Sequence, residues 1–167
     1  MISLDSEGRC LVTDHSTFVL FNVQLFLNQI YFPNGDSSDD RRSFKMRYSQ
    51  AVQWRIEELV AQGRSVILVG DINVCAAEID HCDPKKSIKE LGIEAFQDTP
   101  ARSWFNTFLY PKGVMHDTFR SLHPLDTRAY TVWNTLVNAR YCIANTDLPT
   151  MALESIMCLF HTTCTPL

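Results

Sequence analysis

The chain has 167 residues, 46% of them hydrophobic and 20% charged, which suffices for one hydrophobic core and sets a ceiling of one domain. Its net charge of -4 does not by itself predict a nucleic-acid partner, which usually meets a basic protein face. No apolar run approaches the ~20 residues that span a bilayer, and the first residues lack a signal-peptide pattern. We therefore expect a soluble protein that is not secreted and has no membrane partner.

Hydrophobic periodicity predicts three elements in the first half of the chain. Residues 18–23 alternate as a strand does, and residues 42–62 carry apolar side chains at three- and four-residue spacing, as an amphipathic helix does. Gly63 is expected to end this helix. The β-branched run at residues 66–69 predicts a strand covered on both faces, which Gly70 ends.

The second half is expected to continue the alternation of helices and strands. A Lys-rich connection follows the buried strand, and Pro84 breaks structure within it. Residues 117–120 predict a loop and residues 130–133 a strand. Residues 100–109 predict a short helix with three aromatic residues packed in the core, Trp104, Phe105 and Phe108.

The segment Gly70-Asp71-Ile72-Asn73 places an acidic and an amide side chain at the end of the buried strand. Because side chains alternate along an extended chain, we expect Asp71 and Asn73 to face one cleft and Ile72 to point into the core. A carboxylate can accept a proton from water or bind a divalent metal, and an amide can stabilise a developing oxyanion. The alternative is that both residues only cap a helix or form a turn.

Basic side chains gather in two places along the chain. They either contact phosphate or form solvated helix faces, and we favour the solvated faces for most of them. The first group surrounds the long helix and the second follows the Asp/Asn segment: Arg41, Arg42, Lys45, Arg47 and Arg55, then Lys85, Lys86 and Lys89.

The six cysteines form no C-x-x-C pair, which is typical of a reduced, intracellular setting. A zinc site built from Cys75, His81 and Cys82 is disfavoured, because an adjacent His and Cys do not easily reach one tetrahedral metal together.

A series of short motifs resembles the exonuclease III family of abasic-site (AP) endonucleases, over about residues 3–140. The motifs occur in the order seen in that family: Asn22-Val23, Tyr31-Phe32-Pro33-Asn34, Gly70-Asp71-Ile72-Asn73, Ile79-Asp80, Asp117-Thr118-Phe119-Arg120, Tyr130-Thr131-Val132-Trp133 and Asn138-Ala139-Arg140. Three further pieces are similar to the second eukaryotic class of AP endonuclease: residues 4–9, Phe44-Lys45-Met46-Arg47 and Ile79-Asp80-His81.

The resemblance implies an α/β fold of the endonuclease/exonuclease/phosphatase type, a four-layered α/β sandwich that is incomplete in this chain. It also implies metal-assisted hydrolysis of a DNA phosphodiester, with Mg²⁺ or Mn²⁺ as the cofactor. The implied partner is DNA with abasic sites or blocked 3′ ends. For a full-length protein it further implies a nuclear location and a sliding-clamp partner.

The resemblance also implies roles for eight residues of this chain. Asp71 would orient or deprotonate the attacking water, and Asn73 would hold the water and join Asp71 in binding the metal. Tyr31 would hydrogen-bond a phosphate oxygen, with Asn34 behind it on the DNA. Val132 would line the pocket for the flipped sugar, and Leu136 would insert into the duplex. Asp117 is expected in a turn or as an orienting group, with Arg120 as its ion-pair partner.

Three departures from the family pattern suggest a chain truncated at both ends. The family's opening segment, with an Asn and a Glu that help to bind the metal, is not found, and residues 24–30 interrupt a family strand. We therefore expect a partial nuclease domain at residues 1–140 and a divergent tail at 141–167. The tail lacks the family's closing Ser-Asp-His, and its only histidine, His161, is not assigned the catalytic role.

Three functions remain open on the sequence alone. The first is a DNA repair nuclease that incises 5′ to abasic sites and trims 3′ ends. The second is a related phosphoesterase that acts on lipid or inositol phosphates. The third is a catalytically inactive fragment.

Overall fold

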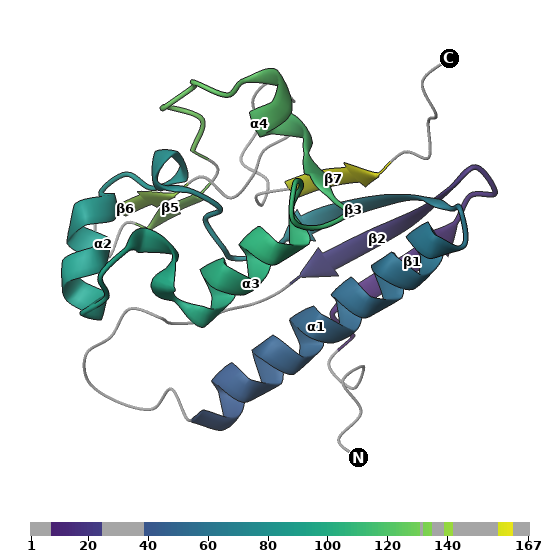
Figure 1. Ribbon diagram of the computed structural model, residues 1–167, viewed down its shortest axis with the longest axis horizontal. Coiled ribbons are helices and arrows are strands. Elements are labelled where there is room, and N and C mark those ends of the chain that lie inside the picture. Colours follow the sequence, from purple (N-terminus) through teal and green to yellow (C-terminus); the bar gives the residue numbers. More distant parts are fainter. Residues whose placement is uncertain (1–7, 25–38, 131, 135–138, 142–156, 162–167) are drawn as a thin grey trace.

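A computed structural model describes residues 8–24, 39–130, 132–134, 139–141 and 157–161 (Figure 1). Its main sheet has five strands in the order β1-β2-β3-β7-β4. Strands β2 and β3 are parallel, and every other neighbouring pair is antiparallel. The strands are β1 (Cys10–Asp14), β2 (Phe18–Gln24), β3 (Ser65–Asp71), β7 (Met157–His161) and β4 (His116–Asp117).

The long helix α1 (Asp39–Ala61) connects the two parallel strands β2 and β3. It confirms the helix predicted at residues 42–62, and Gly63 follows it with φ of 78°. A crossover between parallel strands must return the chain to its starting edge, so α1 runs against the direction of β2 and β3 (Figure 1). The first half of α1 therefore lies toward the carboxyl ends of these strands.

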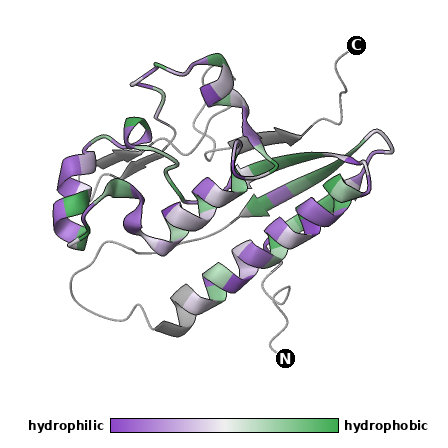
Figure 2. Cartoon of the chain, in the orientation of Figure 1, coloured by the Kyte–Doolittle hydropathy of each residue, from purple (hydrophilic) through white to green (hydrophobic). Residues whose placement is uncertain are grey.

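The hydrophobic core lies between one face of the sheet and the helices α1 and α3 (Pro100–Phe108). Alternate residues of the strands are buried in one core with apolar residues of both helices. Figure 2 shows hydrophobic segments in the strands and mixed hydropathy along the helices. These core residues include Val19, Phe21, Val23, Val66 and Leu68 of the strands, Ile56 and Leu59 of α1, and Trp104, Phe105 and Phe108 of α3.

The prediction that β3 is covered on both faces is confirmed fully for one face and only in part for the other. Val66, Leu68 and Gly70 are buried, whereas Ser65, Ile67, Val69 and Asp71 are only partly buried. The apolar run at residues 66–69 supplies one face to the core and one face that is only half-covered. Because both faces carry apolar side chains, the composition alone does not distinguish them.

Gly70 lies inside β3 and does not end it, contrary to the sequence prediction. Its φ of 116° is open to glycine and strained for other residues. A Cβ atom at this position would lie 1.9 Å from the carbonyl oxygen of Val23 on the neighbouring strand. The glycine therefore permits β2 and β3 to approach closely just before Asp71.

Two predictions in the second half of the chain also need correction. Pro84 does not break structure but begins helix α2 (Pro84–Leu91). Proline is favoured at the first helical position, because the N–H that it lacks would have no partner within the helix. Asp83 caps this helix by accepting a hydrogen bond from the Lys86 N–H at 3.0 Å. Residues 117–120 are not a loop, because β4 ends there and α4 (Thr118–Leu122) begins.

Shorter elements complete the described part of the chain. Two single-turn 3₁₀ helices, η1 (Glu78–Asp80) and η2 (Phe96–Asp98), flank α2. Strands β5 (Val132–Asn134) and β6 (Ala139–Tyr141) pair as a separate two-stranded sheet, and β5 confirms part of the strand predicted at residues 130–133. Helix α3 confirms the prediction for residues 100–109.

Strand β7 comes from the segment predicted to be a divergent tail, and it lies between β3 and β4 in the main sheet. In its register His161 pairs with Val66, near the start of β3, while Met157 pairs with Gly70. At about 3.3 Å per residue, the backbone of His161 is thus roughly 16 Å along β3 from Asp71. The domain boundary at residue 140 stays a prediction.

The β1–β2 hairpin is joined to the end of α1 by an ion pair. Arg64 donates to both carboxylate oxygens of Asp14, at 3.1 and 2.6 Å. Together with the Ser16 N–H, this guanidinium lowers the pKa of Asp14 to about 2.

No helix in the described residues is both long and apolar enough to cross a membrane.

The Asp14 pair predicts a specific acid sensitivity. Its stabilisation is fully present above the unfolded pKa of 3.8 and is lost as the pH falls through about 2. When the pH is lowered from neutral to the acid end of this range, we expect the urea midpoint of unfolding to fall less for Asp14→Asn than for the parent chain. Glu94→Gln, which removes an exposed carboxylate, should keep the acid dependence of the parent. Equal acid sensitivity of Asp14→Asn and parent would contradict the prediction.

Candidate active site

The candidate site lies where the parallel strands β2 and β3 end. Asp71 is the last residue of β3 and pairs with Gln24 at the end of β2. In α/β sheets, ligands bind beyond the carboxyl ends of parallel strands, so Asp71 occupies a position suited to chemistry. This position follows from the crossover topology and not from the Gly-Asp motif alone.

Asp71 and Asn73 are joined by a tight turn and are not related by strand alternation. Asn73 has φ of 54°, in the left-handed region, and its backbone N–H donates to Oδ1 of Asp71 at 2.9 Å. The expectation of an extended chain is therefore wrong here, because the Asp71 side chain bonds its own backbone two residues on. Ile72 is buried in the core, as predicted, and both polar side chains are partly buried.

The other predicted site residues cannot be placed against Asp71. Tyr31, Asn34 and Leu136 lie outside the described residues, and for Val132 the structure describes only the backbone, at the start of β5. Their meeting with Asp71 and Asn73 in one crevice stays a prediction.

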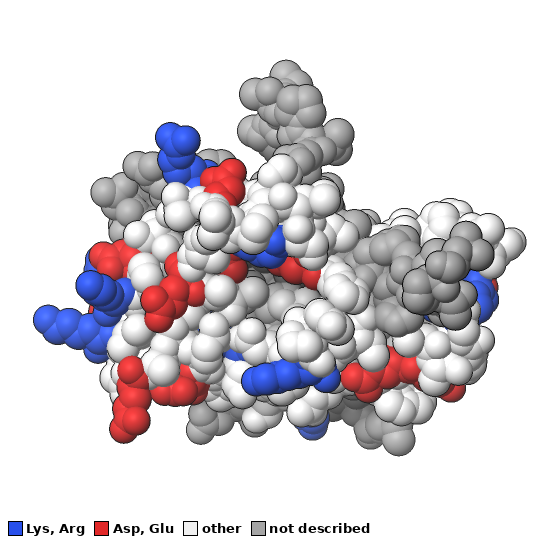
Figure 3. All heavy atoms as spheres, turned by 45° about the horizontal axis from the view of Figure 1, so that its top comes forward, with Lys and Arg blue, Asp and Glu red and all other residues white. Residues whose placement is uncertain are grey.

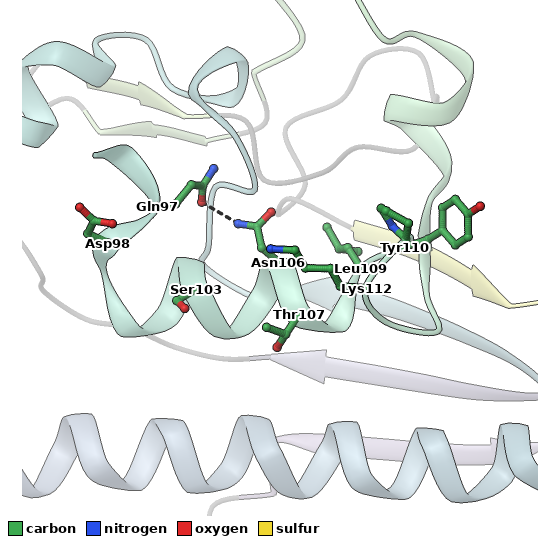
Figure 4. Close-up of a pocket in the computed structure, with 9 residues that line it drawn as sticks. Gln97, Asp98, Ser103, Asn106, Thr107, Leu109, Tyr110 and Lys112 are labelled. Atoms are coloured by element: carbon green, nitrogen blue, oxygen red, sulfur yellow. Dashed lines mark hydrogen bonds between the residues drawn. The ribbon is translucent and has the colours of Figure 1, made fainter. Parts of the chain in front are cut away.

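The loop after Asn73 is fixed by side chains from η2 and α3. The carbonyl oxygen of Ala76 accepts hydrogen bonds from Gln97 Nε2 at 2.9 Å and Asn106 Nδ2 at 3.2 Å. The two amides also bond each other at 2.6 Å, as the dashed line in Figure 4 shows. Since Val74, Cys75 and Ala76 are buried as well, the loop carrying the candidate site is held on a rigid base.

A surface cavity of about 390 Å³ lies on the outer side of this base (Figure 4). Its lining contains none of the predicted site residues, so the cavity and the candidate site do not coincide. The lining residues are Gln97, Asp98, Ser103, Asn106, Thr107, Leu109, Tyr110, Pro111 and Lys112.

A buried ion pair connects two of the sequence motifs. Arg120 contacts Oδ1 of Asp80 through Nε at 2.8 Å and Nη2 at 2.6 Å, and the two side chains are 15% and 1% exposed. Asp80 Oδ2 also accepts from the Ala77 N–H at 2.9 Å, and Arg120 Nη1 donates to the carbonyl oxygens of His123 and Asp126. The pair therefore ties η1, which follows the site loop, to α4 and the turn beyond it.

This pair corrects the predicted partner of Arg120. Asp117 caps α4 by accepting a hydrogen bond from the backbone N–H of Arg120 at 2.8 Å, while the guanidinium of Arg120 is paired with Asp80. Asp117 is therefore a helix cap, where a turn or orienting role was expected. Burial raises the pKa of Asp117.

Within the described ranges, no three side chains of the His, Cys, Asp and Glu types, Cys75, His81 and Cys82 included, form a group that could hold a metal ion. Nδ1 of His81 accepts a hydrogen bond from the Asp83 N–H at 3.0 Å, and its ring meets Phe96 edge-on. Burial lowers the pKa of His81, and the nearby Arg102 adds to this. His81 is therefore part of the packing around α2 and η2.

Lys45 is a residue of the site region that sequence reasoning missed. A solvated face is the favoured interpretation for most basic residues around α1, but only 8% of Lys45 is exposed. Burial lowers the pKa of Lys45 to about 7, against the attraction of the Asp71 carboxylate, which raises it. Its spacing carried a usable signal, since Lys45 stands four and eleven residues before Ser49 and Ile56, which share the buried face of α1.

The other members of the two basic groups whose side chains the structure describes fit the interpretation as solvated helix faces. Arg47, Arg55, Lys85, Lys86 and Lys89 are exposed. Basic and acidic groups are interspersed over the face that Figure 3 shows, without a continuous basic patch on it.

Comparison with known proteins identifies relatives that are named as abasic-site endonucleases. No family model matches the chain. Curated relatives named "DNA-(apurinic or apyrimidinic site) endonuclease 2" are 36% identical over 149 residues in Mus musculus and 33% identical over 150 residues in Homo sapiens. Each alignment covers 83% of this chain and 28% of the relative, so the chain spans less than a third of these proteins.

Solved structures agree with these relatives. The Xenopus laevis APE2 catalytic domain matches with a TM-score of 0.68 at 27% identity, covering 95% of this chain and 48% of that one. An AP endonuclease from Archaeoglobus fulgidus matches with a TM-score of 0.62 at 16% identity, covering 95% and 55%, and supports the fold alone.

The five-stranded mixed sheet, with its helices and these structural matches, defines an α/β protein of the endonuclease/exonuclease/phosphatase fold class. The chain belongs to the AP endonuclease family, of which it represents a portion, and the resemblance to the second eukaryotic class is confirmed.

Proposed function

We propose that the protein is a DNA repair nuclease that hydrolyses the phosphodiester 5′ to an abasic site and also removes nucleotides and blocking groups from 3′ ends. The observation that carries this proposal is the position of Asp71 and Asn73 in a fixed turn at the carboxyl end of β3. Relatives at 36% and 33% identity named as abasic-site endonucleases give the substrate class.

The residues present fit a hard divalent cation. Asp71 and Asn73 supply carboxylate and amide oxygens, which Mg²⁺ and Mn²⁺ prefer, and Mg²⁺ is commonly bound by one or two carboxylates together with substrate phosphates. We propose that these two side chains help to hold Mg²⁺ or Mn²⁺. When bound, such an ion would offset the negative charge that builds up on the phosphate.

Asp71 is proposed to orient and deprotonate the water that attacks phosphorus, and Asn73 to hold this water by its amide. A general base needs a fixed position within hydrogen-bond reach of its proton. The bond from the Asn73 N–H to Asp71 Oδ1 supports this role, because it restrains the carboxylate. Tyr31 is proposed to donate to a phosphate oxygen, with Asn34 contacting the DNA behind it.

Selectivity for abasic sites is proposed to arise from the segment around β5. Extruding a nucleotide costs a few kcal/mol, and least where the base is already missing, so a small apolar pocket favours an abasic sugar by shape. Val132, the first residue of β5, is proposed to line this pocket and Leu136 to enter the duplex. For the whole protein we further propose a nuclear location and binding to a sliding clamp.

A labelled duplex with one abasic site, incubated with the chain and Mg²⁺, tests the proposed reaction. We expect a single cut 5′ to the site, which EDTA abolishes. Asp71→Asn should lower the cleavage rate about 100-fold or more, because general-base catalysis contributes at least that factor. Glu94→Gln is the matched control, since it removes an exposed carboxylate without touching the site loop, and it should cleave at the parental rate.

The same experiment separates the alternatives. Cleavage that Asp71→Asn leaves intact would overturn the assignment of the site. Release of phosphate from an inositol phosphate, with the abasic duplex left uncut, would favour the phosphoesterase. The absence of any cut at high protein concentration would favour an inactive fragment.

A further inference from the structure

The loop between β3 and η1, called the site loop here, has no regular secondary structure of its own. One peptide group near its end, between Ala76 and Ala77, is bound by side chains at both of its polar atoms. Its carbonyl oxygen accepts from Gln97 Nε2 at 2.9 Å and from Asn106 Nδ2 at 3.2 Å. Its N–H donates to Asp80 Oδ2 at 2.9 Å. The plane of this peptide is therefore fixed from η2, α3 and η1 together.

The side chains of Gln97 and Asn106 form a directional pair, with their amides pointing toward one another (Figure 4). Asn106 Nδ2 donates to Gln97 Oε1 at 2.6 Å, which leaves Gln97 Nε2 for the Ala76 carbonyl. The same Nδ2 atom donates to the Arg102 carbonyl oxygen, one turn earlier in α3, at 2.9 Å. Because a carboxamide has one donor end and one acceptor end, Gln97 cannot turn over without losing contacts at both ends.

Both amides come from elements that are anchored in the protein interior. Phe96, which precedes Gln97, is 1% exposed, and Phe105, which precedes Asn106, is 0% exposed. The two elements are also joined to each other, since Arg102 Nη1 donates to the Phe96 carbonyl oxygen at 2.9 Å. The guanidinium of Arg102 lies over the Phe96 ring, 3.6 Å from its centroid. The amide pair is thus a fixed support for the site loop.

A shift of the bound peptide would reach the candidate site through a short, packed segment. Ala76 follows Asn73 by three residues, and the residues between them, Val74 and Cys75, are 4% and 9% exposed. Close-packed side chains leave little room to absorb a displacement. The displacement would therefore reach the turn in which the Asn73 N–H donates to Asp71 Oδ1 at 2.9 Å.

We propose that Gln97 and Asn106 are positioning residues of the active site, which hold the site loop by one peptide and so place its catalytic turn. The catalytic consequence rests on the proposed function, whereas the hold on the loop does not. Neither residue is assigned contact with the DNA, and each acts on Asp71 only through the loop backbone. The Asp80–Arg120 pair binds the other side of the same peptide.

Cleavage kinetics on the abasic duplex test the catalytic consequence. Asn106→Leu and Gln97→Met keep the approximate size of the side chains and remove the amide hydrogen bonds. We expect each variant to lower kcat about 10-fold, because small misplacements of a reacting group cost up to about 100-fold, while KM changes less than about twofold. The combined variant should lose less than the product of the two effects, since the amides form one network.

Two control variants separate positioning from a loss of stability. Ser103→Ala changes an exposed residue of α3 that lines the same cavity and has no described hydrogen bond to Ala76, and it should keep the parental kcat. Val19→Ala removes buried methyl groups where β2 pairs with Val66, five residues before Asp71. It should lower stability but keep the parental kcat per folded molecule, with the folded fraction measured by urea unfolding.

Three kinetic outcomes would overturn the proposal. They are a parental kcat in the combined variant, fully multiplicative losses in the two single variants, and a loss in Val19→Ala as large as that in Asn106→Leu. Asn106→Ala replaces Asn106→Leu if the leucine variant does not fold.

Amide hydrogen exchange tests the hold on the loop without any activity. In nitrogen-15-labelled protein at constant pH, the exchange rate of the Asn73 N–H reports on the turn with Asp71. We expect this rate to rise about 5- to 10-fold in Asn106→Leu, the factor that corresponds to about one net hydrogen bond, and to stay parental in Ser103→Ala and Val19→Ala. If the parent chain does not cleave, the proposed function fails and exchange alone decides the hold on the loop. An unchanged Asn73 rate in the combined variant overturns it.

Discussion

Asp80→Asn is expected to lower the free energy of unfolding by about 3 kcal/mol. Removing one charged partner of a buried ion pair typically costs about 3 to 5 kcal/mol, because the other charge stays buried without compensation. Asp80 is 1% exposed and accepts from both Arg120 and the Ala77 N–H. The asparagine keeps the shape of the side chain but leaves the guanidinium of Arg120 without a counter-charge. Urea unfolding of the parent and the variant measures the difference.

Two further variants separate a buried pair from a surface pair. Asp80→Asn combined with Arg120→Met should recover part of the loss, since no isolated charge then remains. Glu90→Gln breaks the exposed contact between Lys86 and Glu90, 3.8 Å long, and should cost no more than about 0.5 kcal/mol. A similar loss for Asp80→Asn and Glu90→Gln would contradict the structural role of the buried pair.

The pair also explains why two sequence motifs occur together. Ile79-Asp80-His81 and Asp117-Thr118-Phe119-Arg120 both belong to the motifs that resemble the family, and the ion pair joins them across η1 and α4. In this chain, the two motifs therefore help to hold the loop after Asp71 in place. A motif read only for chemistry misses this supporting role.

The elements that sequence analysis predicted correctly are those with strong periodicity. The helix at residues 42–62, the strand at 18–23 and the aromatic helix at 100–109 all show one apolar face at the spacing of their element. Pro84 was misread because proline disrupts a helix interior but is favoured in the first turn. Whether a proline disrupts or begins a helix depends on its position relative to the first helical residue. Hydrophobic periodicity does not locate that first residue accurately.

The site residues named from the sequence stay a prediction, and the geometry expected for two of them differs from the structure. Asp71 and Asn73 were placed together by strand alternation, yet they are joined by a turn in which Asn73 has φ of 54°. Asn is one of the few residues that adopts this conformation readily, so the sequence allowed both geometries. Lys45 was missed because its burial depends on the crossover that brings α1 to the end of β3, which is a tertiary effect.

Gly70→Ala is expected to lower the free energy of unfolding by about 4 kcal/mol or more, since strained φ and a backbone clash combine at one residue. The new Cβ would lie 1.9 Å from the Val23 carbonyl oxygen and 2.8 Å from its carbonyl carbon, and both are backbone atoms. Neither atom can move aside without separating β2 from β3. Urea unfolding measures the loss, and a variant too unstable to fold exceeds the expected value.

Gly63→Ala is the matched control for this substitution. Gly63 also has a positive φ, of 78°, but a Cβ atom there meets nothing within 4 Å. Its replacement should therefore cost only about 1 kcal/mol, the usual effect of conformational strain at a helix end. Equal losses at the two positions would show that strain alone matters at Gly70. A much larger loss at Gly70 would mean that the contact of β2 with β3, and with it the position of Asp71, requires a residue without a side chain.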